Sequence, residues 1–124
     1  KKFLHSHLHK SPLTKRQEVS GYGDANSGHT DTGDNWVVTC AGAKWERGSP
    51  VALQHADTGL FLYARNSDSF NNKNCRGCPI IGQLEISCYR AKSSDRFAQW
   101  ETADGFYFAD VDFSDADEDD DPWA

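Results

Sequence analysis

The chain has 124 residues, of which 37% are hydrophobic, and its formal net charge is −6. A chain of this length fits one small domain. No apolar run approaches the roughly 18 residues of a membrane-spanning helix, and the acidic balance disfavours binding to nucleic-acid phosphates, so neither a membrane span nor a nucleic-acid partner is expected.

Short segments with alternating apolar and polar residues recur along the chain, and this period of two is typical of β-strands. Val51 to His55 alternates in this way, and Asp57-Thr58-Gly59 after it predicts a hairpin turn. No stretch has the three- and four-residue spacing of an amphipathic helix. The sequence therefore predicts an all-β fold with strands at 3–6, 17–22, 35–39, 51–55, 60–64, 84–89, 98–102 and 106–109.

An internal repeat orders these strands. Phe3-Leu4-His5-Ser6 recurs as Phe61-Leu62-Tyr63-Ala64, and Glu18-Val19-Ser20-Gly21-Tyr22 recurs as Glu85-Ile86-Ser87-Cys88-Tyr89. The second copy has extra residues between these two segments, within Asn66 to Gly77, where Asn, Ser and Asp indicate a loop. We interpret the matched apolar positions as structural anchors of copies at about 1–45 and 46–104: Leu4, Val19, Trp36, Leu62, Ile86 and Trp100.

Four strands in each copy indicate a β-trefoil, a fold that needs three copies and twelve strands. About two of the three copies are present, and we expect an N-terminal third to complete the barrel. Residues 110–121 hold eight acidic side chains, without which the rest of the chain carries a net charge of about +2. We interpret 110–124 as an acidic, disordered and solvating tail.

Several motifs in order resemble a MIR repeat. These are Phe3-Leu4-His5-Ser6-His7, Ser11-Pro12-Leu13, Gln17-Glu18-Val19-Ser20 and Asp34-Asn35-Trp36. Cys40-Ala41-Gly42, Trp45-Glu46-Arg47, Pro79-Ile80 and Asp104-Gly105-Phe106 continue the resemblance, which is closest to stromal cell-derived factor 2-like proteins. It covers about residues 1–109 and implies a β-trefoil of MIR repeats.

The resemblance also implies a function. It points to a non-catalytic adaptor in protein quality control of the endoplasmic reticulum, located in the lumen or secreted. The implied partners are a J-domain co-chaperone, a BiP-type chaperone and unfolded or O-mannosylated client proteins. Two alternatives stay open, namely a glycan-binding MIR module and the lumenal MIR part of a protein O-mannosyltransferase.

Histidines at positions 5, 7 and 9 alternate, so in a strand their side chains share one face, and three imidazoles can bind zinc. The second copy keeps no histidine at these positions. We therefore favour a repeat signature in which His5 and His7 line a shallow groove, and we expect neither a metal nor a cofactor.

The four cysteines, Cys40, Cys75, Cys78 and Cys88, are candidates for structural disulfides in an oxidising compartment. Cys75 and Cys78 form a CxxC motif, but no helix follows that would stabilise a reactive thiolate. Pairing of Cys75 with Cys78, or of either with Cys88, fits this interpretation, and the sequence does not choose between them.

No motif of a nucleophile with its base, of a zinc protease or of a phosphate-binding loop occurs, so no catalytic residue is predicted. Glu18 and Glu85 occupy matched positions and reflect the repeat. Aromatic and polar side chains at matched positions are candidates for binding a glycan or partner. Together with the two histidines, the candidates are Glu18, Tyr22, Tyr63, Glu85 and Tyr89.

Overall fold

The structure, a computed structural model, describes residues 1–103, and the regular elements of this part of the chain are β-strands apart from two short 3-10 helices. Its elements are β1 (Phe3–Lys10), β2 (Gln17–Tyr22), β3 (Trp36–Cys40), β4 (Val51–His55), β5 (Phe61–Tyr63) and β6 (Ser87–Tyr89), with short 3-10 helices η1 (Thr32–Asp34) and η2 (Arg96–Ala98). The predicted all-β class is confirmed. The strand expected at 106–109 and the tail at 110–124 lie outside the described residues. No helix within 1–103 has the length and apolarity needed to cross a bilayer.

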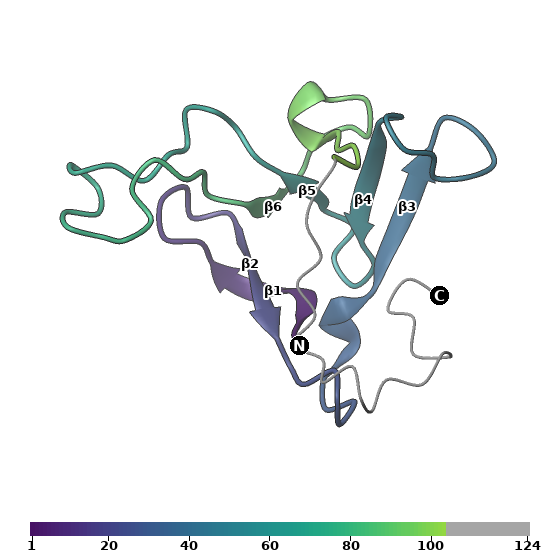
Figure 1. The fold of residues 1–124 in the computed structure, drawn as a ribbon, viewed down its shortest axis with the longest axis horizontal. Coiled ribbons are helices and arrows are strands. Elements are labelled where there is room, and N and C mark those ends of the chain that lie inside the picture. The colour runs from purple at the N-terminus through teal and green to yellow at the C-terminus, as the bar shows by residue number, and fades with distance from the viewer. Residues whose placement is uncertain (104–124) are drawn as a thin grey trace, which may run out of the picture.

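The six strands form one antiparallel sheet in the order β1-β2-β6-β5-β4-β3. Figure 1 shows the β1–β2 hairpin and the β3–β4 pair on two sides of the molecule, with β5 and β6 between them. Although β1 and β3 are the two edges of the sheet, Trp36 at the start of β3 donates its indole N–H to the carbonyl oxygen of Leu4 in β1, at 3.0 Å. The sheet is therefore curled, and its edges meet at this hydrogen bond.

The repeat seen in the sequence is present as two hairpins with the same register. In the first, Phe3 pairs with Tyr22 and His5 pairs with Ser20. In the second, β5 and β6 place Phe61 opposite Tyr89 and Tyr63 opposite Ser87. Matched positions therefore face equivalent positions across the hairpin in both copies.

The segment that follows each hairpin is also duplicated. Asp31 caps η1 by accepting a hydrogen bond from the backbone two residues later, and Asp95 caps η2 in the same way. Trp36 and Trp100 follow these helices, and the indole of Trp100 donates to the carbonyl oxygen of Leu62 at 2.9 Å, as Trp36 does to Leu4. Two copies of one motif are therefore described, whereas a third copy stays a prediction.

The buried interior is small and unusually polar. The buried apolar side chains are Val51, Ala52, Leu62, Tyr63, Cys88 and Ala98, and the buried polar ones are His5, Ser6, Ser11, His55, Glu85 and Ser87. His55 shows how such a group is satisfied, because its ring nitrogens lie 2.9 Å from the Thr58 hydroxyl and 2.9 Å from the Gly33 carbonyl oxygen. Of the sequence anchors, Leu62 is buried, whereas Leu4 and Ile86 are 44% and 41% exposed.

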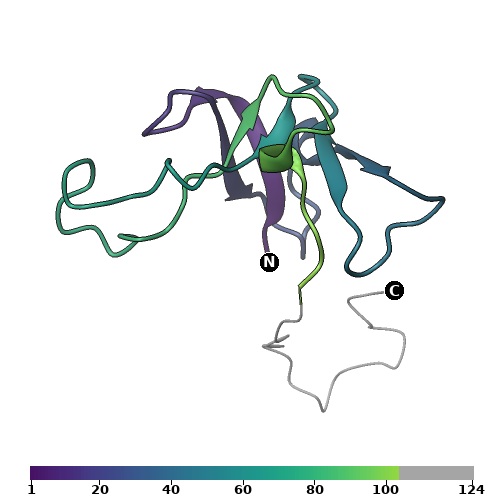
Figure 2. The ribbon, with the colours of Figure 1, turned by 90° about the horizontal axis from the view of Figure 1, so that it is seen from above.

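Two predicted strands differ from the structure. The segment 98–102 is not a strand, because Ala98 belongs to η2 and, of the residues after it, only Trp100 forms a bridge, to Val51. The strand predicted at 84–89 is shortened to β6, since the backbone N–H of Glu85 donates to the carbonyl oxygen of Asp68 in the preceding loop. Figure 2 shows this long loop between β5 and β6 projecting from the sheet.

Candidate functional site

The residues singled out from the sequence fall into three clusters and one separate position. His5, His7 and Tyr22 lie together on the β1–β2 hairpin, and Tyr63 and Tyr89 lie together on β5 and β6. Glu85 binds the loop that joins β1 to β2. The side chain of Glu18 belongs to none of these clusters.

The first cluster is built on two imidazoles that share one face of β1. The His5 and His7 rings have centroids 4.2 Å apart, and the edge of Tyr22 contacts His5 at a centroid distance of 4.4 Å. His5 is 1% exposed, whereas the side chain of His7 is 48% exposed. His5 and His7 thus lie side by side, with His5 in the interior and His7 at the surface.

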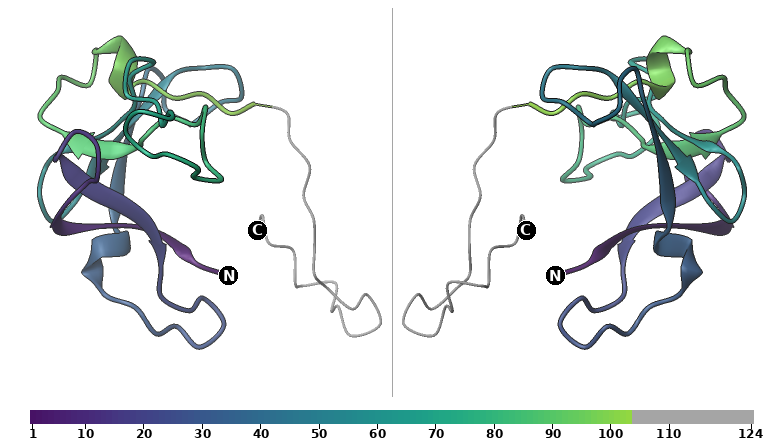
Figure 3. Two further views of the ribbon diagram at one scale, coloured as in Figure 1. Left: turned by 90° about the vertical axis from the view of Figure 1, so that its left-hand side faces the viewer. Right: turned by 90° about the vertical axis from the view of Figure 1, so that its right-hand side faces the viewer.

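An acidic residue that the sequence analysis missed completes this cluster. The two carboxylate oxygens of Asp31 lie 3.0 Å from Nε2 of His5 and 3.1 Å from Nε2 of His7. Asp31 is held there because it caps η1, which lies beside β1 (Figure 3). The backbone hydrogen bond from Gly33 lowers the pKa of Asp31 below its ordinary value, and the nearby histidines act in the same direction.

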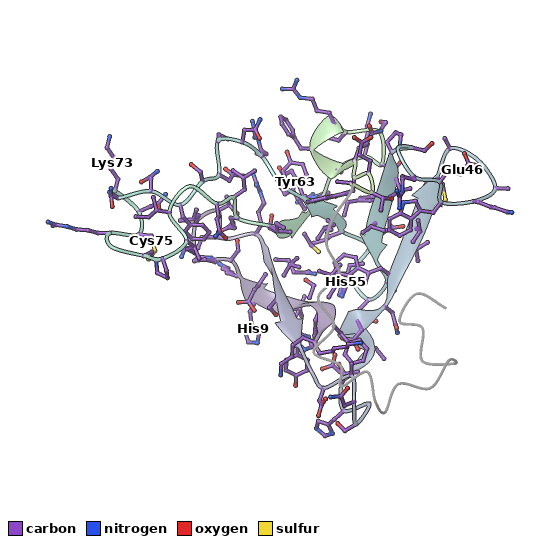
Figure 4. The ribbon with its side chains drawn as sticks, in the orientation of Figure 1. His9, Glu46, His55, Tyr63, Lys73 and Cys75 are labelled. Carbon is purple, nitrogen blue, oxygen red and sulfur yellow. A yellow bond between two sulfur atoms is a disulfide. The ribbon has the colours of Figure 1, made fainter. Side chains whose placement is uncertain are left out.

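Gly33 allows the approach of η1 to His5. A side chain at this position would meet the His5 ring, with its Cβ 2.7 Å from Nδ1, and would also meet the Ser6 carbonyl oxygen at 2.7 Å. His9, by contrast, is exposed and does not join His5, His7 and Asp31; its ring centroid is 6.2 Å from that of His7, and Figure 4 shows it on the outside of the hairpin. A signal for Asp31 was available in the sequence, because Asp95 precedes Trp100 by the same five positions.

The second cluster occupies the matched place in copy two. Tyr63 and Tyr89 have ring centroids 4.9 Å apart, and the guanidinium of Arg16 lies over both rings, 5.0 and 4.5 Å from their centroids. Arg16 is fixed by an ion pair with Asp68 at 2.8 Å, in which both side chains are largely buried. Tyr89 keeps 40% of its surface exposed, whereas Tyr63 is buried.

Glu85 is a structural cap. Its carboxylate accepts hydrogen bonds from the Ser11 hydroxyl, the Leu13 backbone N–H, and both the backbone N–H and the hydroxyl of Thr14, at 2.6–3.3 Å. Burial raises the pKa of Glu85, but the hydrogen bonds from Thr14, Leu13 and Ser11 outweigh this effect and hold the pKa below its ordinary value. A carboxylate held ionised by four donors is a poor general base.

Glu18 occupies the matched position in copy one but is half-buried. Its backbone carbonyl oxygen accepts a hydrogen bond from the Ser6 hydroxyl at 2.6 Å. The two carboxylates that the sequence paired by repeat therefore differ in environment.

Cys75 and Cys78 form a disulfide in the projecting loop, which is one of the pairings that the sequence left open. Cys40 and Cys88, also disulfide candidates, are free cysteines in the structure. Burial raises the pKa of the Cys88 thiol to about 11, so this sulfur is protonated at neutral pH and unreactive. Figure 4 shows Cys75 far from Tyr63 and His55.

A pocket of about 250 Å³ opens beside the histidine cluster. Six residues line it: Ser6, His7, Leu8, His55, Asp57 and Thr58. A small ligand or ion from solvent therefore has access to His7.

Comparison with known proteins gives close sequence relatives. No family model matches the chain. A "stromal cell-derived factor 2-like protein" of Dictyostelium discoideum is 48% identical over 109 residues, which are 87% of this chain and 47% of that protein. The human "stromal cell-derived factor 2-like protein 1" is 35% identical over 106 residues, covering 86% of this chain and 43% of the relative. The chain thus spans slightly less than half of the relatives it matches.

Solved structures agree with these matches. The crystal structure of the SDF2-like protein from Arabidopsis thaliana superposes with a TM-score of 0.69 at 34% identity, over 86% of this chain and 54% of that chain. A Caenorhabditis elegans structure, described as a protein with unknown function, superposes with a TM-score of 0.68 at 36% identity, over 85% of this chain and 53% of that one.

Proposed function

Because this chain belongs, over the part it spans, to the stromal cell-derived factor 2-like family of MIR-domain proteins, we propose that it is a non-catalytic adaptor of protein quality control. It works in the lumen of the endoplasmic reticulum or after secretion. There it associates with a J-domain co-chaperone and a BiP-type chaperone and holds unfolded or O-mannosylated clients.

The observation that carries this proposal is the 48% identity over 109 residues to a protein of that family. Two features of the site support it. The Cys75–Cys78 disulfide suits an oxidising compartment. Glu85, a buried carboxylate at a matched position of the repeat, accepts four hydrogen bonds and therefore has a structural role.

The test is capture of partners from a lumenal extract by the immobilised full-length protein, with identification by mass spectrometry. The Dictyostelium discoideum relative is the positive comparison, and an unrelated secreted β-protein of similar size gives the background. We expect both family members to retain a J-domain protein and BiP, and free mannose to release neither. Capture by the relative but not by this protein would overturn the adaptor proposal.

A second candidate is a glycan-binding module, favoured by two tyrosines at matched positions. Tyr22 and Tyr89 are 46% and 40% exposed, and each lies next to a polar cluster, so each offers part of an aromatic face for stacking on a sugar ring. The relatives reported above carry no transferase name, so the O-mannosyltransferase alternative gains no support.

Glycan binding is tested by titrating mannose and mannosylated peptides into the protein while following tyrosine and backbone resonances. Tyr22→Ala and Tyr89→Ala should abolish the shifts if these rings bind sugar. Trp45→Ala is the matched control, because Trp45 is 48% exposed and lies outside both clusters. Shifts that persist in both tyrosine variants would exclude these positions.

A further inference from the structure

The proposed adaptor function assigns no role to the cluster of His5, His7 and Asp31. All three residues offer a metal-ligating atom, and these atoms lie within 4.8 Å of one another. Zinc holds nitrogen and oxygen ligands at about 2.0–2.2 Å in a tetrahedron, which places neighbouring ligand atoms about 3.3 Å apart. The distances from Asp31 to the two Nε2 atoms, 3.0 and 3.1 Å, are already close to this value.

His5 gives a second, independent indication. Both of its ring nitrogens are buried and have no hydrogen-bond partner. Nε2 is near the Asp31 carboxylate, but the pair lacks the alignment of an N–H···O bond. A buried polar atom without a partner calls for an explanation, and an ion bound through the nitrogen lone pair is one. The contrast is His55, which is equally buried but whose two nitrogens both have partners.

The second copy shows what the same scaffold looks like without the ligands. Asp95 caps η2 as Asp31 caps η1, so the carboxylate alone belongs to the repeat. At the positions of His5 and His7, however, copy two has Tyr63 and Arg65. Neither side chain supplies a neutral imidazole nitrogen that could ligate zinc. The ligand set is therefore specific to the first copy.

We propose that His5, His7 and Asp31 form a binding site for a divalent transition metal, of which zinc is the best fit. Two imidazoles and one carboxylate suit zinc in donor type and number. They leave one coordination position for water or for a donor from a bound partner. His7 and Asp31, whose side chains are 48% and 43% exposed, give the ion its path from solvent, and His7 also lines the 250 Å³ pocket.

The proposal is tested by titrating Zn²⁺ alone into the full-length protein against a chromophoric chelator and by recording the visible spectrum with Co²⁺. All variants carry Cys40→Ser, because this half-buried free thiol competes for metal. His7→Ala removes one ligand from an exposed side chain. Asp31→Asn removes the charge but keeps a side-chain oxygen that can cap η1. His29→Ala, an exposed histidine outside the cluster, is the control.

We expect one equivalent of zinc, a tetrahedral cobalt spectrum without sulfur-to-metal charge transfer, and at least about tenfold weaker binding in His7→Ala and Asp31→Asn. His29→Ala should bind like the parent, and circular dichroism should show that all variants are folded. Equal binding by parent and both ligand variants would overturn the site, as would a thiolate signature. This outcome is independent of partner capture, so it leaves the adaptor proposal unaffected.

Discussion

Glu85 and Thr14 are 71 positions apart in the chain and share two hydrogen bonds, one from the Thr14 hydroxyl at 2.6 Å and one from its backbone N–H at 3.3 Å. The contact ties the second copy to the loop between β1 and β2 of the first. Glu85 is only 5% exposed and Ser11 only 2%, so solvent has little access to this site to replace the carboxylate as a hydrogen-bond partner.

Glu85→Gln should therefore destabilise the protein. The amide has only one acceptor oxygen, and its NH₂ group would face the donors of Ser11, Leu13 and Thr14. Some of the four hydrogen bonds are therefore lost, which should lower the free energy of unfolding by about 2–3 kcal/mol. Urea unfolding measures this. Glu18→Gln, at the matched but half-buried position, is the control and should change stability by less than about 0.5 kcal/mol. Equal effects at the two positions would contradict the structural role of Glu85.

The same carboxylate predicts a dependence on pH. Since the pKa of Glu85 is lower in the folded protein than its ordinary value of 4.5, the folded state binds fewer protons. The stabilisation that ionised Glu85 gives the folded state is fully present above pH 4.5. It is lost as the pH falls from 4.5 towards the pKa of Glu85 in the folded protein. Asp24 and Asp31, whose pKa values are also lowered, act in the same direction in every variant. The stability gap between wild type and Glu85→Gln should thus narrow on acidification from pH 7 to pH 3, and a constant gap would refute this.

Gly33→Ala should be destabilising by about 1–3 kcal/mol, because the added methyl group meets the His5 ring and the Ser6 carbonyl oxygen, and the buried ring has little room to move. Gly42→Ala is the matched control, since nothing lies within 4 Å of the added carbon. Thermal unfolding of the two variants makes the comparison. If Gly33→Ala is as stable as Gly42→Ala, η1 does not pack on β1 as described.

Thiol labelling should distinguish the two free cysteines. Cys88 is 1% exposed and its pKa is raised to about 11, so it has neither access to reagent nor thiolate at neutral pH, whereas Cys40 is partly exposed. Iodoacetamide should modify Cys40 in the native protein, and both cysteines should react in urea. Mass spectrometry of peptides reports the sites. Native labelling of Cys88 at the rate of Cys40 would disagree with its burial.

Much of the fold follows from local pattern. The strands at 17–22 and 51–55 have the predicted bounds. The segment 98–102 also carries apolar residues, but it begins at the end of η2 and pairs with the sheet only through the bridge of Trp100 to Val51, a tertiary contact that local pattern does not reveal.

The histidine cluster shows why a site is harder to predict than a strand. Alternation alone placed His5 and His7 on one face of β1. Their shared partner Asp31 lies 24 positions beyond His7, and only the packing of η1 against β1 brings it within reach. Similarly, nothing local indicates that Arg16 lies over Tyr63 and Tyr89.

The disulfide in the projecting loop has one more consequence. Cys75 and Cys78 flank Arg76, an exposed basic residue at a loop tip, where trypsin-like proteases tend to cut. A cut after Arg76 would leave two fragments still covalently joined through the sulfur bridge, and neither hairpin register involves this segment. A chain nicked there would therefore migrate as one intact species until a reductant separated its halves.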